Sequence, residues 1–331
     1  MKTSDEVLAL LKENMGGFIS GQQIADRLYM TRAAVWKAIK SLKKSGYEIE
    51  AVTNKGYRLR RTADVINAVY IEEGLRTAGL PVCVTYKEET GSTNEDAGYL
   101  IKASKDPVLV IANMQNQGRG RRGRDFYSPK GTGLYMSLAL NRAAELLKTV
   151  KVTAIAAVAV SQAIDNIVYN GRNASFIKWV NDIYIDEKKV CGILSEAFLS
   201  MEDEEQGYVV VGMGINVYEP GEGFPADIKK KAGYLIGAGQ QVKTGLRNDL
   251  AVEVIRLFFH YMNAADESLA IYRRKSNLIG NYVKVNSFVP DDKASGYARV
   301  LGIDDECRLL IEYENGQKET LTSGEVSVVK Y

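Results

Sequence analysis

One loop of the sequence concentrates glycine and arginine, two residue types that together can hold an anion. The seven residues 118–124 run Gly-Arg-Gly-Arg-Arg-Gly-Arg, and the apolar segment 108–112 leads into them. Glycine lets the backbone approach a ligand closely, and the planar guanidinium of arginine suits phosphate and carboxylate groups. The spacing matches neither a Walker motif nor a dinucleotide fingerprint. The pattern indicates an anion-binding loop after a strand, while a solvated basic loop that binds nucleic acid nonspecifically is the plainer alternative.

Polar side chains gather at two further places. Ser92, Thr93 and Asn94 precede a segment with helical spacing, where they can cap the helix or hold a small polar ligand at its N-terminus. A strand predicted over 175–182 ends in Asn181 and Asp182, and a turn predicted at 186–189 ends in Lys189. By itself, the Lys189 amine is interpreted as a solvated turn residue and the Asp182 carboxylate as a turn or capping residue.

The first sixty residues have the pattern of three helices followed by a hairpin. Helical spacing covers 5–14, 21–28 and 32–45, and alternation over 47–60 predicts the hairpin. Residues 1–64 carry twelve Lys or Arg against seven Asp or Glu, whereas the rest of the chain is slightly acidic. This combination favours a winged helix-turn-helix that binds DNA over a protein-interaction module. The predicted DNA contacts are Ser20, Thr31, Arg32, Lys37, Lys40 and Lys55.

The remaining sequence predicts two more domains. A connector helix is expected over 64–78 and a long Ala/Val-rich helix over 149–169, with strands joined by tight turns between them. Strands and helices do not alternate regularly, which favours an α+β domain with a mixed β-sheet. Short strands after 280, with an Asn315-Gly316 turn, predict a small β-barrel. The expected organisation is multidomain: a winged helix-turn-helix over 1–62, a central α+β catalytic domain over 63–278 and a C-terminal small β-barrel over 279–331.

Cysteine and histidine usage excludes several kinds of site. The three cysteines, Cys83, Cys191 and Cys307, are far apart and odd in number, so neither a disulfide framework nor a zinc site is expected and a cytoplasmic location is favoured. The single histidine, His260, lies in an apolar helical segment, which argues against catalytic triads and histidine metal sites. No apolar run is long enough for a membrane span.

Five motifs in a fixed order give the sequence a specific resemblance. They are Gly91-Ser92-Thr93-Asn94, Gln115 with 118–124, Lys178-Trp179-Val180-Asn181-Asp182, Lys189 with 191–194, and Gly212-Met213-Gly214-Ile215-Asn216. Together they resemble the biotin protein ligases. With the winged helix in front, the chain is similar to the bifunctional type, which joins a biotin operon repressor and a ligase in one polypeptide.

The resemblance implies an ATP-dependent biotin–[biotin carboxyl-carrier protein] ligase that forms biotinyl-adenylate and uses magnesium. Biotin would be held by Ser92, Thr93, Asn94, Gln115, Gly118, Arg119, Arg121, Lys189 and Gly192. ATP or the adenylate would be held by Arg121, Arg122, Arg124, Phe126, Asp182 and Asn216. Lys189 and Arg121 would act at the reacting centre, and Asp182 would be the magnesium ligand. The segment 219–239 would be a second loop that orders over the adenylate.

The resemblance also implies partners. They are the biotin carboxyl carrier protein of an acetyl-CoA or pyruvate carboxylase, operator DNA, and a second copy of the chain in a homodimer when liganded, with biotinyl-adenylate as corepressor. One residue departs from the family pattern: Val180 stands where a proline usually follows Lys-Trp. A ligand-sensing repressor with weak or no ligase activity is therefore the alternative. A lipoate or octanoate transferase on a related fold is a third possibility, which the Arg/Gly loop disfavours.

Overall fold

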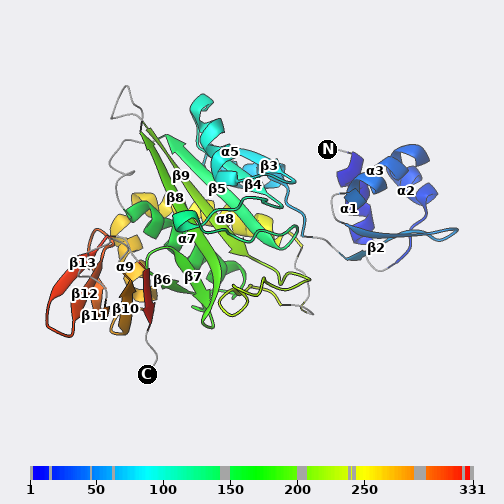
Figure 1. Ribbon diagram of the computed structural model, residues 1–331. Coiled ribbons are helices and arrows are strands. Elements are labelled where there is room, and N and C mark those ends of the chain that lie inside the picture. Colours follow the sequence, from blue (N-terminus) through cyan, green and yellow to red (C-terminus); the bar gives the residue numbers. More distant parts are fainter. Residues whose placement is uncertain are drawn as a thin grey trace. The chain divides into compact units, whose positions relative to one another are not determined.

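Two units of the chain can be described, each by itself. The computed structural model describes residues 3–14, 17–44, 47–61, 64–141, 150–199, 207–237, 240, 244–286, 296–322 and 325–328. By their contacts, the first unit comprises 1–66 with 239–247, and the second comprises 67–238 with 248–331. Figure 1 shows their helices and strands.

The first unit contains the predicted three helices and hairpin. Its elements are α1 (Thr3–Glu13), α2 (Gly21–Arg27), α3 (Arg32–Lys44), β1 (Glu48–Val52) and β2 (Gly56–Arg61). Ser20 begins α2 through a capping box in which its hydroxyl accepts from the Gln23 amide and the Gln23 side chain accepts from the Ser20 amide. Val7, Val35 and Leu59 are fully buried, so helices and hairpin contribute to one core. The helix-turn-helix prediction is confirmed.

The second unit is built around a seven-stranded mixed sheet. Its strand order is β3-β4-β5-β9-β8-β7-β6, in which β3 and β4 are parallel and all other neighbours are antiparallel. The strands are β3 (Cys83–Lys87), β4 (Val108–Ala112), β5 (Gly133–Asn141), β6 (Phe176–Lys178), β7 (Asp182–Ile185), β8 (Lys188–Leu199) and β9 (Gly207–Asn216). The prediction of an α+β domain with a mixed sheet is confirmed.

Helices cover both faces of this sheet. Alternate residues of a strand point to opposite faces, and Glu196 of β8 bonds Asn94 of α5 (Thr93–Leu100), whereas the neighbouring Ser195 bonds Thr153 of α7 (Lys151–Ile167). Thus α5 and α7 lie on opposite faces. This explains why β4 is buried at every position. Three further helices of this unit are α4 (Ala68–Thr77), α8 (Leu246–Asn263) and α9 (Ala265–Lys275). Figure 1 labels α8 and α9.

Three sequence-based boundaries were wrong. The connector helix starts at Ala68 instead of 64, because the Asn67 side chain caps it by accepting from the Tyr70 amide. The strand expected over 175–182 is interrupted after Lys178, and β7 begins at Asp182. The turn expected over 186–189 is only Asp186-Glu187, both with positive φ, so Lys189 lies within β8.

Residues after 280 form a five-stranded antiparallel sheet. The predicted closure of this sheet into a barrel is not seen among the described residues. Its order is β13-β12-β11-β10-β14, and among the described residues no pairing joins β13 to β14 to close it. The strands are β10 (Tyr282–Asn286), β11 (Gly296–Ile303), β12 (Leu309–Tyr313), β13 (Lys318–Leu321) and β14 (Glu325–Val328). The sequence therefore predicted the strands and the Asn315-Gly316 turn, while closure of the sheet stays a prediction.

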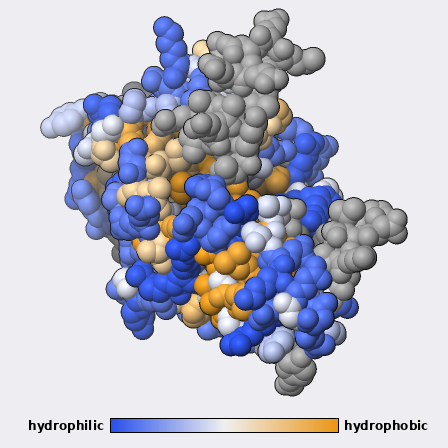
Figure 2. Space-filling model, turned by 90° about the vertical axis from the view of Figure 1, so that its left-hand side faces the viewer, coloured by the Kyte–Doolittle hydropathy of each residue, from blue (hydrophilic) through white to orange (hydrophobic). Residues whose placement is uncertain are grey.

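Apolar residues on the visible surface are scattered. Figure 2 shows hydrophobic residues in separate areas among mainly hydrophilic ones. Within the parts of the chain that the structure describes, no helix combines the length and the apolar character that a bilayer crossing requires.

Candidate functional site

A cavity of about 540 Å³ opens on the α5 face of the central sheet, over positions that carry no side chain. Gly192 of β8 pairs with Gly214 of β9, and Gly212 follows on the same face. A side chain at Gly214 would overlap the Phe126 ring, and one at Gly212 would overlap the Asn94 amide. These two glycines therefore make room for the Phe126 ring and the Asn94 amide, which pack against the sheet and line the cavity. The volume of the cavity is that of an ordinary small-molecule site.

The Arg/Gly loop borders this cavity as a narrow hairpin. The Gly120 amide donates to the Arg124 carbonyl at 2.7 Å, and the Phe126 amide donates to the Gly118 carbonyl at 2.7 Å. Arg122 and Gly123 follow each other with φ of 61° and 70°, a left-handed conformation that arginine seldom adopts. The turn thereby directs several guanidinium groups from one short segment to the cavity, whose lining includes Arg119, Arg121, Arg122 and Arg124.

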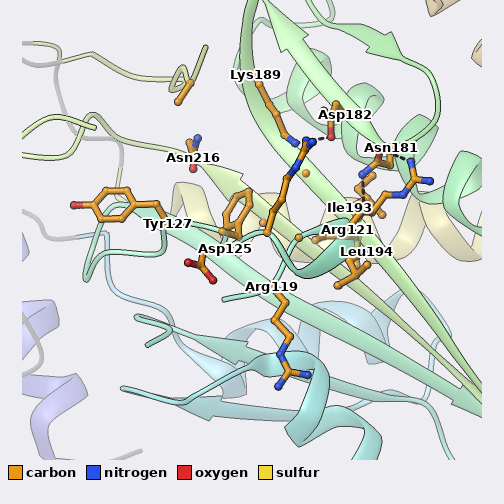
Figure 3. Close-up of a pocket in the computed structure, with 18 of the residues that line it drawn as sticks. Arg119, Arg121, Asp125, Tyr127, Asn181, Asp182, Lys189, Ile193, Leu194 and Asn216 are labelled. Atoms are coloured by element: carbon orange, nitrogen blue, oxygen red, sulfur yellow. Dashed lines mark hydrogen bonds and ion pairs between the residues drawn. The ribbon is translucent and has the colours of Figure 1, made fainter. Parts of the chain in front are cut away.

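A charged cluster lies at one end of the cavity, where Lys189, Asp182, Asn181 and Arg121 converge (Figure 3). Lys189 Nζ lies 2.6 Å from Asp182 Oδ1, because β7 and β8 are antiparallel neighbours. Arg121 Nη1 donates to Asn181 Oδ1 at 3.3 Å, and Asn181 Nδ2 donates to the Ile193 carbonyl at 2.8 Å. The cluster thus contains two cations and one carboxylate, and the excess positive charge suits an anionic ligand.

Another wall of the cavity, called the polar wall below, is a hydrogen-bonded network at the N-terminus of α5. The Thr93 amide and hydroxyl both donate to Gln115 Oε1, at 2.9 and 3.0 Å, and Gln115 Nε2 donates to Ser128 Oγ. Behind them, fully buried Ser137 has its Oγ 2.7 Å from Thr93 Oγ1 and 2.6 Å from Asn94 Oδ1. Ser92 begins the helix but makes no side-chain capping bond. Its hydroxyl is therefore not committed to capping.

The segment 219–237 forms a further side of the cavity. The Lys189 amide donates to the Lys231 carbonyl and the Gly233 amide donates to the Lys189 carbonyl, both at 2.8 Å. Asn216 Nδ2 donates to the Gly233 carbonyl at 2.9 Å. Asp227, Ile228, Lys231 and Ala232 consequently line the cavity. The family resemblance implied a loop over 219–239 but did not indicate which of its residues line the cavity.

Nearly all residues predicted for biotin and ATP lie around this one cavity. The lining includes Ser92, Thr93, Asn94, Gln115, Arg119, Arg121, Arg122, Arg124, Phe126, Asp182, Lys189, Gly192 and Asn216. Gly118 is not among them. A side chain there would overlap the Phe126 carbonyl, so glycine at this position allows the two arms of the hairpin to approach each other. Arg119 forms an ion pair with Glu95 and extends away from the charged cluster (Figure 3).

Sequence inspection missed several lining or supporting residues. Ser137 is a single polar residue in the apolar strand 133–140, a signal that would have identified it. Tyr127 and Phe224 line the cavity and lie edge to face, with ring centroids 6.4 Å apart. Trp179 is 5 % exposed, and its indole N–H donates to the Cys307 carbonyl at 2.9 Å. The peptide bond between Trp179 and Val180 is cis.

Burial raises the pKa values of two groups in strands beside the cavity, Tyr184 and Cys191. Burial, and next the Asp182 carboxylate, raise the pKa of Tyr184 to about 12. Burial also raises the pKa of the Cys191 thiol far above its ordinary value. A thiol that stays protonated is a poor nucleophile. Cys191 therefore has no place as a covalent catalyst.

The residues predicted to meet DNA lie in the first unit. Arg32, Lys37 and Lys40 are exposed on α3, and Lys55 is exposed in the turn between β1 and β2. The Thr31 hydroxyl accepts from the Ala34 amide at 3.2 Å, and the Ser20 hydroxyl is used in the capping box. These two residues act as helix caps, and contacts of theirs with DNA stay predictions.

Comparison with known proteins agrees with this geometry. The chain is 35% identical over 318 residues to the bifunctional ligase/repressor BirA of Bacillus spizizenii, with 95% of each chain covered. The chain belongs to the biotin protein ligase family. Residues 84–216 match the Biotin/lipoate A/B protein ligase family, 4–58 match an HTH domain, and 278–329 match the Biotin protein ligase C terminal domain. BirA of Escherichia coli (strain K12) is 29% identical over 334 residues, which is 98% of this chain and 96% of that protein.

Solved structures from this family have a similar fold over three quarters of this chain. The biotin protein ligase of Aquifex aeolicus in complex with biotin and ATP is similar, with a TM-score of 0.58, 25% identity, and coverage of 75% of this chain and 99% of that one. A mutant of the same Aquifex aeolicus ligase in complex with biotin gives a TM-score of 0.59 and 26% identity over the same coverage.

Proposed function

We propose that this protein is an ATP-dependent biotin ligase that also represses transcription. The observation that carries the ligase assignment is a single cavity lined by residues of all five ordered motifs. It lies over the sheet glycines Gly192, Gly212 and Gly214, called the glycine floor below, and beside the polar wall and the charged cluster. The reaction joins the biotin carboxylate to the α-phosphate of ATP with loss of pyrophosphate. A lysine amine of a biotin carboxyl carrier protein then attacks the acyl carbon of biotinyl-adenylate, and AMP leaves.

Each wall of the cavity has a task in this reaction. The Thr93, Gln115 and Ser137 network at the polar wall is suited to the ureido ring, because neutral hydroxyl and amide groups there match a neutral polar ligand. Lys189 and Arg121 in the charged cluster would neutralise the charge that develops as carboxylate and phosphate meet. Phe126 over Gly214 would offer its ring to the adenine base.

No nucleophile of the enzyme is required for either step. Holding two anions in contact is the difficult part, and fixed positive charge with excluded water serves that purpose. The segment 219–237, tied to Lys189 and Asn216 through its backbone, would shield the adenylate from water. Val180 in place of proline does not remove the cluster, since Asn181 and Asp182 both reach it.

Magnesium fits the site through one protein ligand. Asp182 is the only carboxylate in the charged cluster described above, and no group of three or more His, Cys, Asp or Glu gathers elsewhere in the described chain. Magnesium is commonly held by one or two carboxylates together with substrate phosphates. Asp182 would supply the carboxylate, and the ion would offset phosphate charge.

The test of the ligase assignment follows both half-reactions. Purified protein with biotin, ATP and magnesium is expected to release pyrophosphate, and addition of a biotin carboxyl carrier domain should give one biotinylated lysine by mass spectrometry. A carrier domain with that lysine changed to arginine is the control, and it should stay unmodified. Pyrophosphate release equal with and without biotin would contradict the assignment.

The repressor assignment rests on the first unit and on its relatives. We propose that biotinyl-adenylate acts as corepressor by favouring a homodimer, which presents two winged helices to a two-fold operator. DNA affinity should therefore rise when biotin and ATP are added together. An affinity that is the same with and without them would refute this coupling. We further propose domain limits of 1–62, 63–278 and 279–331, with the C-terminal sheet closed into a small barrel.

A further inference from the structure

The exposed face of α3 has an aromatic residue at its centre. Val35, Ala38, Ile39 and Leu42 are buried in the core of the first unit, which leaves Arg32, Trp36 and Lys40 as one stripe at four-residue spacing on the other side. Trp36 is 55 % exposed, and no hydrogen bond joins its indole N–H to any other described residue. The predicted DNA contacts on this helix are all basic or small, so the indole has no role in the proposed function so far.

The positively charged side chains around Trp36 indicate what kind of partner the indole ring contacts. Lys40 Nζ lies 5.2 Å from the centre of the indole ring, and Arg32 and Lys37 are exposed beside it. A large apolar group within a cationic face is suited to a polyanion that also presents apolar features. The major groove of B-DNA admits a helix, and the C5-methyl group of thymine is its apolar feature.

We infer that Trp36 reads a thymine in the major groove by contact of its indole ring with the C5-methyl group. Arg32, Lys37 and Lys40 would then fix the helix on phosphates, which positions the helix without reading sequence. This inference rests on the proposed DNA-binding function and makes Trp36 a residue that determines operator sequence. The alternative is that this face of α3 binds a protein. In that case, replacing thymine by uracil in the DNA would not change the affinity.

The test uses a base that lacks only the methyl group. Full-length protein with biotin, ATP and magnesium first selects a duplex from a random-sequence pool. Each thymine of that duplex is then replaced by deoxyuridine, one position at a time, and Kd is measured by fluorescence anisotropy. One position in each half-site should weaken wild-type binding about fourfold, the effect of one buried methyl group.

Protein variants are measured on the same thymine and uracil duplexes. Trp36→Ala is expected to weaken binding to the thymine duplex about tenfold, comparable to one lost base contact, and to bind the thymine and uracil duplexes equally. Trp36→Phe keeps an aromatic ring and should retain part of the uracil penalty. Tyr99→Ala removes another aromatic residue, 77 % exposed on α5, and should behave as wild type. Biotin transfer by Trp36→Ala reports that the second unit is folded, and the far-ultraviolet circular dichroism and thermal unfolding of the same full-length protein report whether the helices of the first unit are intact.

The outcomes separate the two hypotheses. If Trp36→Ala binds the selected duplex as wild type does, or keeps the full uracil penalty, the thymine contact is refuted while DNA binding stands. The same holds if deoxyuridine at every position leaves wild-type affinity unchanged. If wild-type protein binds no duplex at all, the proposed repressor function fails and the inference fails with it.

Discussion

Lys189 is the residue on which the chemistry of the cavity depends most. Its ammonium is 2.6 Å from Asp182 and faces the space that the guanidinium groups surround. Lys189→Met should lower the rate of biotin-dependent pyrophosphate release about 100- to 1,000-fold, the effect of removing one group that stabilises charge in a transition state. The free energy of unfolding should change by no more than about 1 kcal/mol, because the pair is partly exposed.

Its neighbour in sequence provides the control. Lys188 is exposed and its Nζ donates to the Lys230 carbonyl at 2.6 Å, outside the charged cluster. Lys188→Met should release pyrophosphate near the wild-type rate. A Lys189→Met enzyme as fast as Lys188→Met would remove Lys189 from the reacting centre.

Gly214 tests the glycine floor. A methyl group at this position would overlap the Phe126 ring, so Gly214→Ala should displace the ring and raise KM for ATP about 10- to 100-fold. KM for biotin should change less, since the polar wall is not touched. Gly98→Ala in α5 is the matched control, because its added methyl meets only ordinary contacts and alanine favours a helix. Equal KM values for the two variants would disprove the role of the floor.

The sequence motifs predicted most of the residues that line the cavity, because many polar and charged residues lie within a few short segments. The motifs did not predict which side chains contact one another. Gln115 was expected to meet the ligand, yet its amide is already used between Thr93 and Ser128, 22 and 13 residues away. Arg119 was expected at biotin, and it pairs with Glu95. Such pairings depend on which strands become neighbours, and no local pattern encodes that.

At the scale of elements, the segment between β6 and β7 is held from outside the catalytic sheet. Trp179 donates to the Cys307 carbonyl in the turn between β11 and β12, and the Tyr272 hydroxyl of α9 donates to the Val180 carbonyl at 2.9 Å. Asn181 and Asp182 follow immediately. The C-terminal elements thus support the strand that bears part of the charged cluster.

Tyr272→Phe should show this support directly. The substitution leaves the Val180 carbonyl buried without its donor, which costs about 1–3 kcal/mol in the free energy of unfolding. It should also lower kcat for adenylation, because Asn181 and Asp182 lose a fixed anchor. Tyr261→Phe removes the hydroxyl of another buried tyrosine, on α8, and is the control. Urea unfolding and pyrophosphate release measure both; identical behaviour of the two variants would exclude a supporting role.

Elements with strong local signals were predictable, and those ended by tertiary contacts were not. The first-unit helices carry periodic apolar residues and a capping box at Ser20, so their bounds nearly agree with prediction. The end of β6 has neither glycine nor proline to mark it. The two-residue turn Asp186-Glu187 adopts positive φ without glycine, so the usual hairpin signal was missing and Lys189 was assigned to a turn.

For the molecule as a whole, buried tyrosines predict loss of stability in alkali. The pKa of Tyr184 is raised to about 12 by burial, above its value of 10.0 in the unfolded chain. The folded state therefore holds this proton more tightly, and the stabilisation present below pH 10 is lost as pH rises toward 12. The contribution of Tyr184 should fall by about 1.4 kcal/mol per pH unit in that interval.

Chemical denaturation between pH 9 and about pH 12 measures this loss. Tyr184→Phe should lose stability less steeply than wild type, whereas Tyr99→Phe, exposed on α5, should follow wild type. Other groups titrate in all three proteins, so the difference isolates Tyr184. Parallel curves for wild type and Tyr184→Phe would contradict the burial argument.

The central claim is that one cavity binds biotin and activates it with ATP, and calorimetric titration with biotin tests it most directly. Titrations are made with and without ATP and magnesium, on wild type and on Arg121→Gly. We expect saturable biotin heat in wild type, much tighter binding with adenylate formed when ATP and magnesium are present, and weaker or leaking binding in Arg121→Gly. No biotin heat under any condition would contradict the assignment of this cavity.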